Sequence, residues 1–352
     1  MKKYFFAVII RIIILFPYKV YAADYNRQID SLLDEYNIPQ EYTSNLTIEN
    51  IYNFFIEKAL DSLYEPIRLG VKLCTVIMLC ATVKVLQNDT KDTNDITDTV
   101  SCLMTFTILL GPVTELLNII SENLFTIKNF MTSFLPVYAG ISMASGELVT
   151  SGIYSGFFLT AIIFITNFTV KIIIPAIQFY FAMIISNALS PYIKLQSLCD
   201  FYIKVVKWIM RSIVSVICFI LTIQTTISQG KDTMVLKAGK ALAGSAIPVI
   251  GSVLQDAVGS VYAGMEAIKG YAGAAGIIGA VSIFMPSVIT LSIYWFVINI
   301  VNILCEIFGL KSVSLCVKGY INVIEITQSI LFLFMVLFIF SLAIMVSLTN
   351  GV

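Results

Sequence analysis

Long apolar runs dominate the chain and leave it few folds to adopt. A helix needs about 20 apolar residues to cross a bilayer, and runs of that length exceed what the core of an ordinary soluble domain uses. The chain is 58% hydrophobic and 12% charged, whereas soluble domains carry about 25% charged residues. At about 20 residues per span, the sequence predicts an all-α, polytopic membrane protein with six to eight spans. The principal runs are Ile67–Leu86, Asp98–Ile120, Ile153–Leu189, Trp208–Ser228, Tyr271–Phe308 and Ser329–Leu348.

The amino-terminal residues have the pattern of a secretory signal. Lys2 and Lys3 precede an apolar core, and small residues end it at Ala22; the alternative is an uncleaved membrane anchor. Residues 23–65 are acidic and show helical spacing of apolar residues. Since so short a segment cannot form its own core, we expect it to lie outside the cytoplasm and to pack on the membrane body or on a partner.

Several helices are predicted to be broken or re-entrant. Pro136, Gly140 and Gly146 interrupt the apolar stretch 130–150, and non-helical backbone at membrane depth is tolerated where protein or water surrounds it. A kinked packing helix is the equal alternative. Pro175 divides the run 153–189, and Pro286 is the natural break in the run 271–308. Either run is long enough for two spans.

Two charged residues are predicted to lie at membrane depth. Glu115 falls in the second apolar run and Lys171 in the third. Ionisable groups there tend to face protein or water and to serve a function. The alternative for Glu115 is a carboxylate near the interface of a short span. A secondary transporter using one of these residues as its coupling group is the second functional hypothesis.

The basic connector at residues 190–207 gives a clue to orientation. Lys194, Lys204 and Lys207 outnumber Asp200, and the positive-inside rule places such a connector in the cytoplasm. With an external amino terminus, this requires an odd number of preceding spans. Either the stretch 130–150 crosses fully or the run 153–189 crosses once, and the sequence leaves both open.

The segment Gln224–Gly264 lies between apolar runs and is nevertheless rich in Gly, Ala, Ser and charge. Pro248 suits the first turn of a helix, and the residues after it form an amphipathic helix. A basic helix precedes it. We expect this segment to pack against other spans or partners; a place beside a conduit is the further alternative. Its candidate contact residues are Gly230, Asp232, Lys237, Lys240, Pro248, Gly251 and Asp256.

The residue inventory argues against an enzyme. The chain has no histidine, which removes the commonest general base and metal ligand. The seven cysteines form no CxxC pattern and are expected to be buried thiols. No catalytic residue, metal, cofactor or nucleic-acid partner is predicted. The expected segments are 1–22, 23–65, 66–228, 229–270 and 271–352.

Two blocks of sequence resemble the stage III sporulation protein AE family. The first contains Gln229-Gly230, Asp232, Lys237–Lys240, the Ile247–Gly251 sequence IPVIG, and Asp256-Ala257. The second is the Phe134–Gly146 sequence FLPVYAGISMASG. Together with the order and length of the remaining segments, the resemblance covers nearly the whole chain.

This resemblance implies a multi-pass protein of the mother-cell membrane that surrounds the forespore. It implies a non-enzymatic subunit of a secretion-like channel complex that sustains late forespore sigma-factor activity and spore formation. Expected partners are the other proteins of the stage III sporulation A operon, including an ATPase and ring-forming subunits, the lipid bilayer, and indirectly stage II sporulation protein Q.

Overall fold

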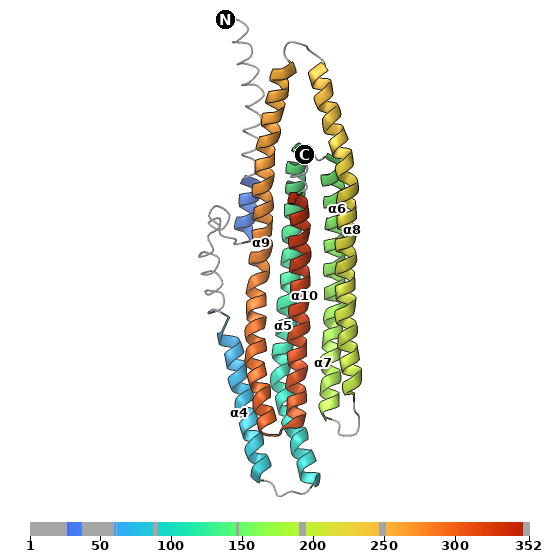
Figure 1. Ribbon diagram of the computed structural model, residues 1–352. Helices are drawn as coiled ribbons and strands as arrows, with labels where there is room; N and C mark the ends of the chain where they lie inside the picture. Colours follow the sequence, from blue (N-terminus) through green and yellow to red (C-terminus); the bar gives the residue numbers. More distant parts are fainter. Residues whose placement is uncertain are drawn as a thin grey trace.

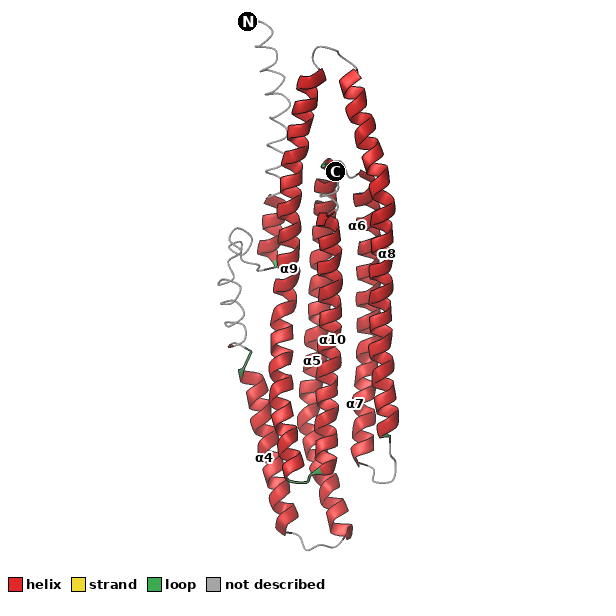
Figure 2. Ribbon diagram, viewed as in Figure 1, coloured by secondary structure: helices red, strands yellow, loops and turns green. Residues whose placement is uncertain are grey.

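The computed structural model describes the backbone of residues 27–36, 60, 62–86, 91–145, 148–189, 195–245 and 251–347. Its secondary structure in these residues is helical throughout (Figure 2). A short helix at 27–35 precedes the long helices. These are α4 (Tyr64–Leu86), α5 (Lys91–Ala144), α6 (Leu148–Phe168), the π-helix η1 (Thr169–Ile173), α7 (Ile174–Leu189), α8 (Gln196–Ser245), α9 (Gly251–Ile307) and α10 (Lys311–Ser347).

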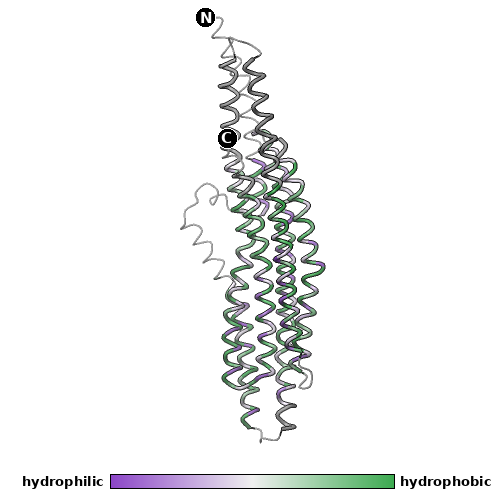
Figure 3. Tube along the Cα trace, turned by 45° about the vertical axis from the view of Figure 1, so that its right-hand side comes forward, coloured by the Kyte–Doolittle hydropathy of each residue, from purple (hydrophilic) through white to green (hydrophobic). Residues whose placement is uncertain are grey.

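The long helices run up and down in one elongated bundle (Figure 1). Helix α10 packs against α5, α7, α8 and α9, and α4 packs on α5 and α9. Six helical stretches of the described chain are long and apolar enough to cross a membrane, which confirms the predicted all-α polytopic class. Hydrophobic residues follow most of the bundle (Figure 3). The six stretches are Tyr64–Leu86, Thr97–Ala144, Ser151–Leu189, Gln196–Ile223, Gly270–Ile307 and Lys311–Ala343.

Aromatic side chains fill the interior of the bundle. Phe338 of α10 is fully buried and contacts the rings of Phe158 on α6 and Phe284 on α9 at centroid distances of 6.0 and 5.7 Å. On α5, Phe130 and Phe134 stack at 5.6 Å. Since lipid tails are as apolar as these side chains, close packing rather than escape from water holds such helices together.

The expected break near residue 136 is absent from the structure. Pro136 and Gly140 both lie inside α5, which continues to Ala144. Residues 130–144 therefore belong to a continuous packing helix, as the alternative to a broken helix supposed. Gly146 lies outside the described residues.

Pro286 does not divide its apolar run into two spans either, because α9 continues through it as one helix. A proline has no N–H to donate and crowds the carbonyl groups of the preceding turn. The Asn123 side chain of α5 donates to the Ile283 carbonyl of that turn at 3.1 Å and to Ser287 Oγ at 2.6 Å. This contact ties the turn around Pro286 to α5.

The third apolar run also crosses once. Around Lys171 and Pro175, where a division was expected, the chain forms the π-helix η1 and then continues as α7. The wider turn lets the Ile174 N–H donate to the Thr169 carbonyl. A single π-turn of this kind takes up local irregularity within a longer helix.

The short helix at 27–35 packs on the membrane body. Ile29 and Leu33 are buried, Tyr271 of α9 donates to Asp30 at 3.1 Å, and the Tyr36 ring meets Phe130 edge-on at 5.3 Å. Burial raises the pKa of Tyr36, and nearby Glu35 raises it further. The body thus supplies the surface that this part of the acidic segment needs; residues 37–59 lie outside the described chain.

Candidate functional site

The predicted contact residues of the polar segment gather at one end of the bundle. Gly230, Asp232, Lys237 and Lys240 lie on the last turns of α8, and Gly251 and Asp256 lie on the first turns of α9. Figure 1 shows α8 and α9 extending here beyond the ends of α5, α6 and α10. We call residues 224–269 the α8–α9 hairpin. Pro248 lies outside the described residues.

The two charges predicted at membrane depth both lie on the outer surface of the bundle. Glu115 is exposed on α5 and Lys171 is exposed on η1. Within the described chain neither makes an ion pair. The structure therefore does not join them into an internal site.

Sequence reasoning missed a second charged cluster, which lies between α8, α9 and α10. Lys207 Nζ lies 3.6 Å from a carboxylate oxygen of Glu325, and Trp295 Nε1 donates to the other oxygen at 3.3 Å. One helical turn further along α10, Gln328 donates to Ser292 Oγ of α9 at 2.9 Å. The sequence signal that could have found it is Glu325, an acidic residue in an otherwise apolar stretch of α10.

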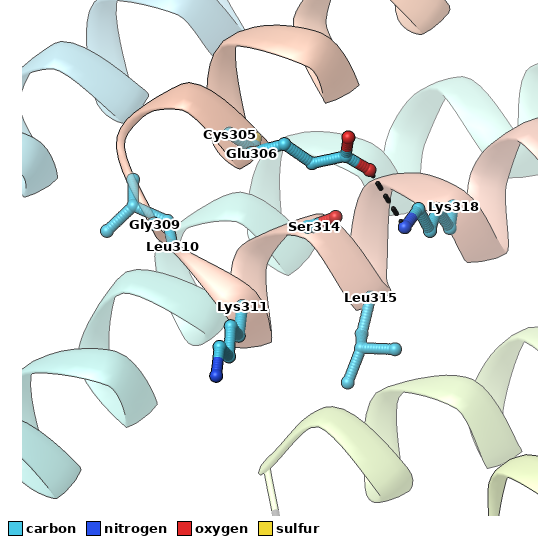
Figure 4. A pocket seen from close by; sticks show the side chains of 8 residues that line it. All are labelled: Cys305, Glu306, Gly309, Leu310, Lys311, Ser314, Leu315 and Lys318. Carbon is cyan, nitrogen blue, oxygen red and sulfur yellow. Dashed lines mark ion pairs between the residues drawn. The ribbon is translucent and has the colours of Figure 1, made fainter.

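An open pocket lies at the turn between α9 and α10 (Figure 4). Lys318 and Glu306 form an ion pair across it at 2.9 Å. Asn302 donates to Glu306 at 3.1 Å and accepts from Ser314 at 2.9 Å. These contacts fix the two helices to each other. The lining residues are Cys305, Glu306, Gly309, Leu310, Lys311, Ser314, Leu315 and Lys318.

The turn itself is closed by Gly309, whose φ of 66° suits glycine. The Leu310 N–H donates to the Cys305 carbonyl at 2.9 Å, which is the long bond of a Schellman motif. Lys84 of α4 donates to the Gly309 carbonyl at 3.1 Å and pairs with Asp98 of α5 at 3.4 Å. This end of the bundle is therefore a polar clamp joining α4, α5, α9 and α10.

The seven cysteines are free thiols, and most of them are buried. Burial of thiols was expected, and Cys80, Cys102, Cys199, Cys305 and Cys316 are buried. Cys102 of α5 and Cys316 of α10 lie with their Sγ atoms 2.9 Å apart and below 2% exposure. Among the residues that the structure describes, no group of His, Cys, Asp or Glu is arranged to hold a metal.

Comparison with known proteins agrees with this architecture. A family model described as stage III sporulation protein AE matches residues 32–349. The curated stage III sporulation protein AE of Bacillus subtilis (strain 168) is 20% identical over 332 residues, which cover 92% of this chain and 79% of the relative. No solved structure matches. The match to nearly the whole chain shows that this protein belongs to the stage III sporulation protein AE family.

Proposed function

We propose that this protein is a non-enzymatic membrane subunit of the channel complex that links mother cell and forespore during sporulation. The observation that carries the proposal is the family match over residues 32–349, on a chain whose described part folds as one helix bundle with six candidate spans. In this proposal the protein resides in the mother-cell membrane around the forespore. Its partners are the other proteins of the stage III sporulation A operon, and indirectly stage II sporulation protein Q.

The order of the spans supports an orientation for the subunit. Three candidate spans, formed by α4, α5 and α6–α7, precede the basic connector at 190–207, most of which forms the first turns of α8. Three is an odd number, so an external amino terminus places this connector in the cytoplasm, in agreement with the positive-inside rule. The polar clamp at the α9–α10 turn lies at the same end of the bundle (Figure 1).

The same count places the α8–α9 hairpin on the opposite side, facing the space between the two cells. The hairpin carries Lys231, Asp232, Lys237 and Lys240, and its end extends beyond α5, α6 and α10 (Figure 1). In this proposal it is the part of the chain that meets partners in the intermembrane space. The cytoplasmic ATPase would instead meet the clamp end.

Deletion of the gene in its sporulating host tests the proposal. We expect heat-resistant spores to fall to background and a reporter of late forespore sigma-factor activity to stay silent, while engulfment proceeds. Restoring the intact gene at another chromosomal site controls for effects on neighbouring genes. Normal spore counts together with normal late forespore transcription in the deletion strain would rule the proposal out.

A further inference from the structure

The exposed side of α5 is unusually polar for a membrane helix. Polar residues recur at helical spacing along it and share one side of the helix. All of them are exposed, although they lie inside the candidate span Thr97–Ala144. We call this set the α5 polar face: Thr107, Thr114, Glu115, Asn118, Glu122, Thr126 and Asn129.

The threonine hydroxyl groups of this face donate hydrogen bonds to the backbone of α5, but its carboxylates and the Asn118 amide have no such partner. Thr114 and Thr126 donate to carbonyls of their own helix at 2.7–3.2 Å. Within the described chain, the side chains of Glu115, Asn118 and Glu122 make no hydrogen bond or ion pair. Each charged group exposed to lipid at this depth costs about 3 kcal/mol on insertion scales. The face is therefore unsuited to lipid and needs a polar occupant.

One exposed cation of the described chain that suits this face is Lys171. It is exposed on η1 and unpaired among the described residues. Its depth follows from two contacts between antiparallel helices: Ser151 donates to the Ala139 carbonyl at 3.0 Å, and the Phe181 and Phe106 rings lie 6.2 Å apart. Counting along the helices from these contacts places Lys171 level with residue 119 or residue 116 of α5.

Lys171 thus lies between the levels of Glu115 and Glu122, at most about 9 Å along the helix axis from either at 1.5 Å per residue. The exposed lysine on α4 fits less well. The Lys84–Asp98 contact places Lys72 level with residue 110, well below Glu122. Membrane insertion gives every copy of the chain the same orientation. Groups on two copies can therefore pair only if they lie at equal depth.

We propose that the α5 polar face binds the η1 face of a second copy of this chain, with Lys171 of one copy between Glu115 and Glu122 of the next. A two-fold contact between two α5 faces would instead bring like charges together. Because two different surfaces meet, the contact is heterologous and builds a closed ring when the rotation between copies closes. This inference concerns self-association and does not rest on the proposed channel function.

The test is the oligomeric mass of the purified full-length protein in lipid nanodiscs. We expect the wild type to be an oligomer, and both Lys171→Glu and Glu115→Gln/Glu122→Gln to shift to monomer mass. The triple change Glu115→Lys/Glu122→Lys/Lys171→Glu exchanges the charges and is expected to restore the oligomer. Lys72→Glu makes the same charge change at an exposed lysine outside the contact. We expect this variant to remain an oligomer.

A thermal melt of each variant verifies that the subunit remains folded. A monomeric wild type would overturn the proposal, as would oligomeric Lys171→Glu protein. Failure of the triple variant to restore assembly would also overturn it, because the charges would then not face each other.

Discussion

Replacing Phe338 with Ala is expected to destabilise the bundle by about 3 kcal/mol, at the lower end of the range for buried Phe→Ala changes. The ring is fully buried and contacts Phe158, Phe284 and Phe334 from three helices. Its removal leaves a cavity whose lining loses van der Waals partners. The lower end applies because lipid, rather than water, is the alternative environment of these side chains.

The measurement is the thermal midpoint in detergent, followed with a thiol-reactive dye that reports exposure of the buried cysteines. Phe332→Ala is the matched control, since Phe332 lies on the same helix and is 41% exposed. We expect a large downward shift of the midpoint for Phe338→Ala and a small one for Phe332→Ala. Equal shifts would contradict the placement of Phe338 at the centre of the bundle.

Replacing Gly279 with Leu is expected to separate α9 from α5. A Cβ atom at Gly279 would lie 2.5 Å from Cζ of Phe130, and one at Gly276 would lie 2.5 Å from Cζ of Phe134. Both rings are buried and have no free space to enter. Overpacking of this kind costs about 1–3 kcal/mol, and a leucine is expected at the upper end.

Gly270→Leu provides the control on the same helix, because nothing lies within 4 Å of a Cβ atom there. The yield of monodisperse protein and the thermal midpoint are expected to fall for Gly279→Leu and to hold for Gly270→Leu. If both variants behaved like the wild type, α5 and α9 would not be in the close contact described.

The helical spans could be predicted from the sequence because apolar length alone identifies them. The close approach of Gly276 and Gly279 to Phe134 and Phe130 of α5 is visible only in the structure. The prolines were the source of error. A sequence shows that Pro286 lacks a donor, but it does not show that α9 continues through it or that Asn123 of α5 holds the adjacent turn.

The candidate site was less predictable for a related reason. Glu325 and Lys207 become a pair only when α8 and α10 are placed side by side. No local sequence pattern predicts that contact. Glu115 and Lys171 could be selected individually as charges at membrane depth. Their similar levels along the bundle required the registration of α5 against α6 and α7.

The orientation of the α8–α9 hairpin tests the account most directly. We expect Lys240→Cys, near the end of α8, to react with a membrane-impermeant maleimide added to intact cells that express the protein. Lys91→Cys, at the start of α5, is expected to react only after the cells are permeabilised; the wild type gives the background of its native cysteines. Labelling of Lys91→Cys but not of Lys240→Cys in intact cells would contradict the account, because the hairpin would then face the cytoplasm.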